Sequence, residues 1–258
     1  MMNLSSNRAF LYGDGVFESI LIRHGKAPFL AYHLTRLRES LAILDINPPF
    51  SLNSTAEIWR HIQSITQYDT QNTYRVRLSV WRDSTGLYAP NSNQSDFLFQ
   101  AQIIDVAAQI FFLDKVDICP SVRLAYDSFS AIKSLSAGRY VAAARFRQAQ
   151  GLDDCFLLNT DGRIAEASSS NVFIVTDDNT IYTPALSEAC INGVMRRVIL
   201  ETLSTLSYKV IEGQIDLNCL AQAKEIFLSN AISGVRTILF YNQRNLDAFI
   251  ANKLRELF

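Results

Sequence analysis

The hydrophobic positions of the first hundred residues follow two different periods. Apolar residues at alternating positions or in short runs bounded by turn formers predict strands over residues 15–23, 27–30, 74–82 and 97–104. Leucines and isoleucines that recur every three or four residues predict helices over residues 34–44 and 58–65. Residues 83–94 are rich in turn formers. This mixture predicts a two-layer α/β domain at the N-terminus.

The second half of the chain mixes helices and strands in shorter segments. Helical spacing covers residues 137–150, 194–203 and 217–223. Strand-like segments cover residues 153–158, 163–166, 172–175, 180–182, 208–212 and 225–229, and Asp161-Gly162 predicts a hairpin turn between the first two. The fold class predicted for the whole chain is α/β (α+β), with a mixed, β-barrel-like C-terminal domain that carries helices. We expect an N-terminal domain over 1–110, a packed linker over 111–120 and a C-terminal domain over 121–258.

Composition narrows the class of protein. The 258 residues are 48% hydrophobic and 19% charged, which is typical of a globular enzyme, and the net charge of −1 argues against a nucleic-acid partner. The N-terminus lacks the basic and apolar layout of a signal peptide, and no apolar run is long enough to cross a membrane. Four scattered cysteines without CxxC spacing predict neither a disulfide framework nor a metal site. We therefore expect a reduced, cytoplasmic enzyme.

Three groups with complementary chemistry occur in order in the second half. Lys133 stands in an otherwise uncharged stretch, Glu166 opens the run Glu-Ala-Ser-Ser-Ser-Asn, and Gly193 precedes an apolar helix. A lysine amine can hold an aldehyde as a Schiff base, and a carboxylate can keep a pyridine nitrogen protonated. The amides of a helix N-terminus can hold a phosphate. Together these are the requirements of a pyridoxal phosphate (PLP) enzyme, although each residue alone is more often a surface lysine, a capping carboxylate or a turn glycine.

Four separated motifs resemble those of the class IV aminotransferases, the PLP fold type IV family. They are Tyr12-Gly-Asp-Gly-Val-Phe-Glu18, His33-Leu-Thr-Arg-Leu37, Glu166-Ala-Ser-Ser-Ser-Asn171 and Gly193-Val-Met195. The resemblance covers about residues 7 to 240, and motifs in the right order are more specific than any one of them. It implies PLP in the cleft between two domains and a homodimer whose pocket takes a loop from the second subunit.

The resemblance also implies roles for individual residues. Lys133 would carry the cofactor and move the substrate's α-proton, and Glu166 would pair with the pyridine nitrogen. Arg36 and the backbone amides of Val194 and Met195 would hold the phosphate. The remaining predicted cofactor contacts are Ser170, Asn171, Asn230 and Ala231. Met195 and Ala231 depart from the family, which often has hydroxyl side chains at these two positions.

Phe17, Arg77 and Arg82 are the candidates for the substrate side. Phe17 would form a pocket wall, and the arginines would bind a substrate carboxylate, although arginines on an alternating strand are more often solvated or paired with acids.

Three segments are more similar to the family's 4-amino-4-deoxychorismate lyase branch than to its other members. They are Arg82–Pro90, Leu186–Arg196 and Phe227–Ile232, and the Tyr-x-Arg-Pro turn of many branched-chain enzymes is absent. This similarity favours a lyase that forms 4-aminobenzoate and pyruvate for folate biosynthesis. A branched-chain or D-amino-acid aminotransferase is the alternative. A PLP-binding homologue without catalysis is a third, disfavoured by the intact Lys133, Glu166 and Arg36.

Overall fold

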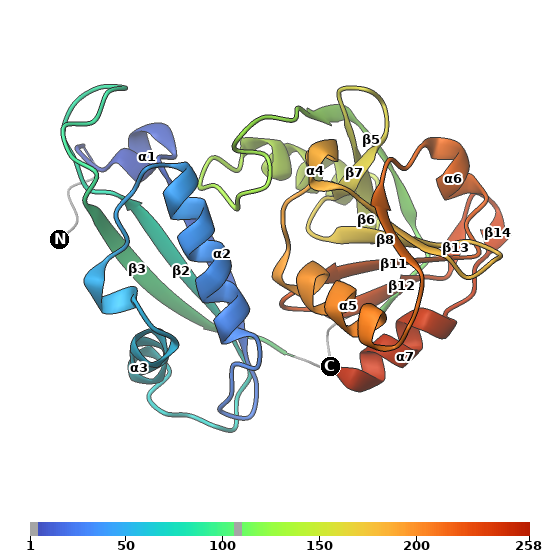
Figure 1. Ribbon diagram of the computed structural model, residues 1–258, viewed down its shortest axis with the longest axis horizontal. Helices are drawn as coiled ribbons and strands as arrows, with labels where there is room; N and C mark the ends of the chain where they lie inside the picture. The colour runs from blue at the N-terminus through green and yellow to red at the C-terminus, as the bar shows by residue number, and fades with distance from the viewer. Residues whose placement is uncertain (1–4, 106–109) are drawn as a thin grey trace. The chain divides into compact units, whose positions relative to one another are not determined.

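The computed structural model describes residues 5–105 and 110–258, and its chain divides into two compact units (Figure 1). The N-terminal unit contains residues 5–105 and 132–137, and the C-terminal unit contains residues 110–131 and 138–258. The division near residue 108 falls outside the described residues. The predicted linker 111–120 differs from the structure, because it contains β4 (Phe112–Leu113) and the start of β5 (Val116–Leu124), two strands of the C-terminal unit.

The N-terminal unit is an antiparallel sheet in the order β1-β2-β3 with two helices packed on it. Its elements are α1 (Arg8–Tyr12), β1 (Gly15–Ile22), α2 (Leu30–Ile43), the 3-10 helix η1 (Phe50–Leu52), α3 (Thr55–Ile65), β2 (Tyr74–Arg82) and β3 (Ser95–Ile103). The α2 helix contacts β1 and α3 contacts β3. The strand predicted over 27–30 is wrong: Pro28 cannot donate to a ladder, and the chain turns there into α2.

Residues 132–137 join the N-terminal unit through β1. Ser134 forms an antiparallel bridge with Val16, the Phe17 amide donates to the Lys133 carbonyl at 2.9 Å, and the Leu135 amide donates to the Gly15 carbonyl at 2.9 Å. A Cβ at Gly15 would lie 2.4 Å from the Val80 carbonyl oxygen, so only glycine allows this close approach. The backbone from the Lys133 carbonyl to Leu135 is therefore fixed against β1.

The C-terminal unit contains the greater number of elements. Its helices are α4 (Gly138–Ala149), η2 (Leu186–Glu188), α5 (Val194–Thr205), α6 (Leu217–Ala221) and α7 (Phe249–Leu257). In addition to β4 and β5, its strands are β6 (Asp154–Asn159), β7 (Ile164–Ala167), β8 (Asn171–Val175), β9 (Ile181–Pro184), β10 (Val210–Gly213), β11 (Glu225–Asn230), β12 (Gly234–Ile238), β13 (Phe240–Tyr241) and β14 (Arg244–Asn245).

These strands form a six-stranded mixed sheet, β10-β9-β8-β11-β12-β4, and a three-stranded sheet, β5-β6-β7, beside the short β13-β14 pair. Both larger sheets contribute to one buried core, in which Phe156 and Leu158 of β6 meet Val172 of β8 and Leu228 of β11. The predicted fold class, mixed α/β with a barrel-like C-terminal unit, is confirmed.

Two helices cover outward faces of these sheets. Ala143 of α4 packs in a second core cluster with Cys155 and Leu157 of β6. The α5 helix contacts β11, the strand in which Phe227 stacks on Phe173 of β8 with ring centroids 4.9 Å apart. The C-terminal unit thus has a shared core between its sheets and further buried faces outside them.

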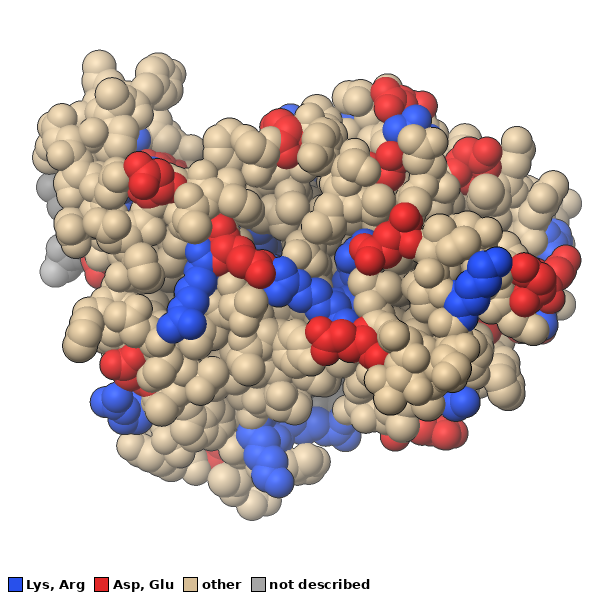
Figure 2. Space-filling model, viewed as in Figure 1, with Lys and Arg blue, Asp and Glu red and all other residues tan. Residues whose placement is uncertain are grey.

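Figure 2 shows acidic and basic side chains interspersed over the viewed face rather than gathered by sign. Within the described residues, no helix has both the length and the apolar character that a membrane span requires.

Candidate active site

Glu166 is a buried carboxylate held by two donors. It lies on β7 opposite Leu157, with 3% of its surface exposed. Its Oε1 accepts a hydrogen bond from the Tyr140 hydroxyl at 2.5 Å, and its Oε2 accepts from the Ile191 amide at 2.9 Å. Burial, and then the charge of Glu166, raise the pKa of Tyr140, so the phenol remains a donor. The carboxylate is therefore fixed from α4 and from the segment before α5.

The N-terminus of α5 offers backbone donors. Gly193 is its N-cap and makes no side-chain cap, so the first-turn amides of Val194 and Met195 have no intrahelical acceptor. Asn171 binds the same segment, with its Nδ2 donating to the Ile191 carbonyl at 2.8 Å. A Cβ at Gly193 would lie 2.0 Å from the Asn171 Oδ1. The close packing of Gly193 on Asn171 therefore sets where α5 begins.

Gly193→Ala is expected to weaken PLP binding by about tenfold, or about 1.4 kcal/mol, while the protein still folds. The added methyl displaces Asn171 from the Ile191 carbonyl, and Ile191 also holds Glu166. Gly138→Ala is the matched control, because a Cβ there would meet nothing within 4 Å. Titration of both apo-proteins with PLP measures the effect, and equal affinities would contradict it.

Ser170 and Asn230 form a second polar group in the C-terminal unit. The Ser170 Oγ accepts from the Asn230 Nδ2 at 3.1 Å and from the Arg236 Nη2 at 2.8 Å. The Asn230 Oδ1 accepts from the amides of Ile232 at 2.9 Å and Ser233 at 2.7 Å. Asn230 therefore shapes the turn that carries Ala231.

Lys133 lies beside Phe17 and Arg77 in the N-terminal unit. Its Nζ is 4.6 Å from the centroid of the Phe17 ring, and the Arg77 Cζ is 3.7 Å from the same centroid. The Arg77 Nε donates to the Ser79 Oγ at 3.1 Å. Burial, and then the charge of Arg75, lower the pKa of Arg77, which still remains cationic. Phe17 therefore has an amine and a guanidinium near one ring, and these two cations are suited to binding an anionic group.

Arg36 is buried against a carboxylate. Its Nε donates to the Glu18 Oε1 at 2.8 Å and its Nη2 to the Glu18 Oε2 at 2.5 Å, while His33 Nδ1 lies 2.6 Å from the same Oε2. Burial would raise the pKa of Glu18, but the charge of Arg36, followed by His33, outweighs it and lowers this pKa to about 2. Glu18 thus orients the Arg36 guanidinium from one edge.

The Glu18 pair makes stability depend on pH. Because the folded pKa of about 2 lies below the ordinary 4.5, its contribution is complete above pH 4.5 and is lost as the pH falls towards 2. Glu18→Gln should abolish this part of the pH dependence and cost about 3–5 kcal/mol at neutral pH, because the variant removes the buried negative charge that both Arg36 and His33 contact. Denaturant unfolding of both proteins across this pH range measures it, and parallel curves would contradict the assignment.

Arg82 has a structural environment. Its guanidinium donates to the Asp14 Oδ2 and the Asn93 Oδ1, and to the carbonyls of Asp45 and Leu44, at 2.6–3.0 Å. All three of its nitrogens are engaged within the N-terminal unit, and the side chain is buried. This geometry favours a structural role for Arg82 over the substrate-binding role expected for it.

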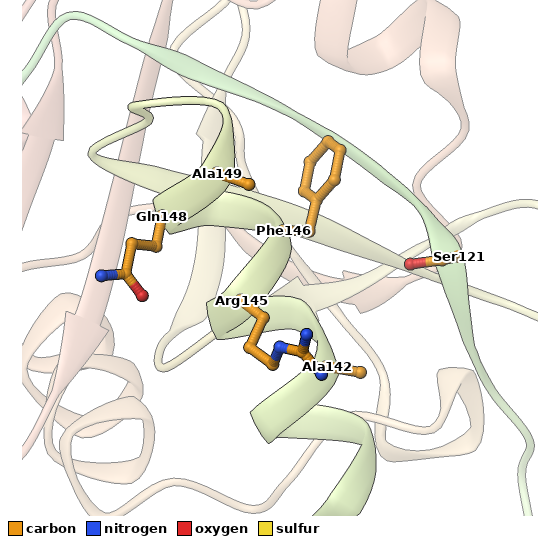
Figure 3. A pocket seen from close by; sticks show the side chains of 6 residues that line it. All are labelled: Ser121, Ala142, Arg145, Phe146, Gln148 and Ala149. Atoms are coloured by element: carbon orange, nitrogen blue, oxygen red, sulfur yellow. The ribbon is translucent and has the colours of Figure 1, made fainter.

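A separate hollow of about 470 Å³ lies between α4 and Ser121 of β5 (Figure 3). It is lined by Ser121, Ala142, Arg145, Phe146, Gln148 and Ala149. None of the predicted site residues lines it, and Arg145 is its one charged lining residue. It is therefore distinct from the groups around Glu166.

Residues 15–239 match the family model described as amino-transferase class IV. The chain belongs to the class IV aminotransferase family. It is 28% identical over 231 residues to a probable branched-chain-amino-acid aminotransferase of Rickettsia felis, covering 88% of this chain and 77% of the relative. It is 26% identical over 240 residues to the aminodeoxychorismate lyase of Bacillus subtilis, covering 88% and 77%.

Solved structures agree with this family. A putative 4-amino-4-deoxychorismate lyase from Legionella pneumophila matches with a TM-score of 0.84 and 25% identity, covering 98% of this chain and 92% of that one. A PLP-bound aminotransferase from Brucella abortus shares the fold, with a TM-score of 0.85, 21% identity and coverage of 100% and 91%. This class IV family member is therefore a PLP-dependent enzyme with transaminase and lyase homologues.

The residues of the C-terminal unit fit this cofactor. A pyridinium nitrogen needs an ionised, oriented carboxylate, and Glu166 has two donors that hold it in place. A phosphate needs backbone donors with close access, which the uncapped start of α5 at Gly193 provides. The motifs predict Glu166, Val194 and Met195 as cofactor contacts, and they give no signal for Tyr140 or Arg236, which contact Glu166 and Ser170.

Proposed function

We propose that this enzyme is a 4-amino-4-deoxychorismate lyase. The observation that carries the proposal is the place of the lyase-like segment Leu186–Arg196, whose Ile191 amide binds Glu166 and whose Gly193 begins α5. The segment thus bears on the site itself. Relatives with the lyase name, one curated and one of known structure, support it at 26% and 25% identity.

The predicted site residues have the following roles in this proposal. Bound PLP supplies an electron-accepting ring for the pair of electrons left when a proton departs. Lys133 holds the cofactor and takes the proton from the substrate carbon that bears the amine, while Glu166 keeps the ring nitrogen protonated. Arg36 and the amides of Val194 and Met195 bind the phosphate, and Ser170, Asn171, Asn230 and Ala231 support this end.

Phe17 and Arg77 face the substrate in this proposal. Arg77 binds a carboxylate of the substrate, and Phe17 keeps Arg77 and Lys133 together. After proton removal, the C–O bond to the three-carbon side chain breaks and the ring becomes aromatic. The departing enolate takes up a proton and becomes pyruvate, so the reaction needs no oxidant and no second substrate.

We also propose a cytoplasmic homodimer. The N-terminal unit exposes apolar side chains at its surface, with Leu87 78% and Tyr88 88% exposed and the Tyr88 ring centroid 5.6 Å from that of Tyr12. Arg8 fixes this loop by donating to the carbonyls of Gly86, Leu87 and Tyr88. An ordered, exposed apolar loop is suited to contact with a second subunit. Sedimentation measures the assembly, and a stable, fully active monomer would overturn the proposal.

A branched-chain aminotransferase is the second candidate, favoured by the 28% identity to the Rickettsia felis relative. A side-by-side assay separates the two. The lyase proposal expects 4-aminobenzoate and pyruvate from 4-amino-4-deoxychorismate faster than glutamate from leucine, isoleucine or D-alanine with 2-oxoglutarate. Robust glutamate formation from a branched-chain amino acid without 4-aminobenzoate would overturn the lyase proposal and leave PLP dependence intact.

A further inference from the structure

A buried ion pair lies behind Ser170 in the C-terminal unit. Asp154 is the first residue of β6 and has no exposed surface, and the side chain of Arg236 on β12 is 9% exposed. The Arg236 Nη2 donates to the Asp154 Oδ2. The other oxygen of Asp154 accepts from the Ser168 hydroxyl at 2.6 Å and the Ser168 amide at 3.2 Å. Asp154 is therefore anchored on both sides.

The same Arg236 nitrogen is connected to the turn after β11 by hydrogen bonds through Ser170 and Asn230. Its Nη2 donates to the Ser170 Oγ at 2.8 Å, and that oxygen also accepts from the Asn230 Nδ2 at 3.1 Å. The side-chain Oδ1 of Asn230 in turn accepts hydrogen bonds from the backbone amides of Ile232 and Ser233. One continuous chain of hydrogen bonds thus joins Asp154 to residues 230–233.

The sheet register explains why these residues meet. Arg236 is paired with Leu228 across β12 and β11, and Leu228 is paired with Val172 on β8. Their side chains share the face that looks into the common core, as does Ser170, which lies two residues before Val172. The chain of hydrogen bonds is therefore on the inner side of the sheet.

The energy of this buried ion pair indicates that it orients neighbouring side chains rather than stabilising the fold. Burying two charges costs several kcal/mol, and the attraction between them often does no more than offset it. The Arg236 Nε is also buried without a partner among the described residues. The guanidinium therefore leaves one donor unsatisfied while it places Nη2 between Asp154 and Ser170.

We propose that Arg236, anchored by Asp154, is a positioning residue that fixes Ser170 and Asn230 and thereby the turn 230–233 as part of the phosphate end of the cofactor site. The inference rests on the proposed roles of Ser170, Asn230 and Ala231. Arg236 touches neither cofactor nor substrate, and it acts through the turn. The ligand class concerned is the phosphate monoester of a pyridoxal compound.

The test compares PLP with pyridoxal, which lacks the phosphate, by titration of the full-length apo-protein. Arg236→Gln and Ser170→Ala should each raise the Kd for PLP about tenfold, which is about 1.4 kcal/mol, and change the Kd for pyridoxal less than about twofold. Arg255→Gln is the matched control. Arg255 donates to the Val235 carbonyl and the Thr237 hydroxyl on the same strand, but contacts neither Ser170 nor Asn230.

A purely structural role would weaken both ligands alike, so the ratio of the two Kd values decides. The inference is overturned if the ratio of the pyridoxal Kd to the PLP Kd is unchanged in both variants. It is also overturned if this ratio falls as much in the Arg255→Gln control. If Arg236→Gln fails to fold, Arg236→Lys takes its place, because it keeps a buried positive charge beside Asp154 but removes the planar guanidinium that donates to both Asp154 and Ser170. A wild-type protein that binds neither PLP nor pyridoxal overturns the proposed function as well, and is thereby distinguished from failure of the inference alone.

Discussion

Lys133→Ala is expected to lose the covalent link to PLP and all measurable turnover. Alanine has no amine with which to bind the cofactor. The Phe17 amide holds the backbone of residue 133 against β1, so a neighbouring residue cannot take the place of Lys133. Removing both the covalent anchor and the proton-transfer group should lower kcat by several orders of magnitude, each factor of ten being about 1.4 kcal/mol of barrier. Visible absorbance of the cofactor and single-turnover rates measure the two effects.

Lys209→Ala is the control for this variant, because Lys209 is an exposed lysine of the C-terminal unit. It should retain the absorbance band and the rate of the wild type. A Lys133→Ala protein with an unchanged cofactor spectrum in the absence of added amine would show that another lysine carries PLP.

Glu166→Gln is expected to keep PLP bound and to lose most of the rate. The amide preserves the size of the side chain, and its oxygen can still accept from Ile191 or Tyr140. It cannot stabilise a protonated ring nitrogen as a carboxylate does, so kcat should fall by about two to four orders of magnitude, or about 3–5 kcal/mol of barrier. Steady-state kinetics at saturating PLP, together with a PLP titration, separate rate from binding.

Tyr140→Phe gives the graded comparison. It removes one hydrogen bond to Glu166 and leaves the carboxylate and the Ile191 contact in place. The loss in kcat should then be about three- to tenfold, or about 0.7–1.4 kcal/mol of barrier, which is less than the about 1.5–3 kcal/mol of a hydrogen bond to a charged group, because the carboxylate keeps its charge and its bond to Ile191. Equal losses in the Glu166→Gln and Tyr140→Phe variants would mean that orientation, rather than charge, is the contribution of Glu166.

Much of the fold could be predicted from periodicity. The strand predicted over 74–82 is β2 residue for residue, and the helix predicted from 194 begins there as α5. Burial alternates in β2 from Tyr74 to Leu78, and buried residues recur at helical spacing in α5, so both segments keep a recognisable period. The failures have local causes: Pro28 interrupts an apolar run, and β4, β13 and β14 are two residues long, too short to show any period. The sequence analysis assigns no element over residues 234–258, where β12 and α7 lie as well.

Some residues of the candidate site could likewise be predicted from the sequence, and others could not. The family motifs point to Glu166, Arg36 and the start of α5 as candidates, because each motif is contiguous in sequence, and Lys133 is predicted from the resemblance and from the uncharged stretch around it. Tyr140 and Arg236 could not be predicted in this way. Tyr140 contacts Glu166, 26 positions away, and Arg236 contacts Ser170, 66 positions away, so both contacts depend on tertiary packing. Arg82 is a different case: it is a predicted carboxylate binder, whereas the folded chain surrounds its guanidinium with acceptors, which favours a structural role.

The central claim, that Lys133 is the residue that carries PLP, has one direct measurement. Borohydride reduction of the enzyme as isolated with PLP fixes the cofactor to its lysine, and peptide mass spectrometry then locates the pyridoxyl group. The sequence contains five other lysines that could be labelled: Lys26, Lys115, Lys209, Lys224 and Lys253. We predict a single pyridoxyl group on the peptide that contains Lys133. A label on any of the other five with Lys133 unmodified would contradict the account.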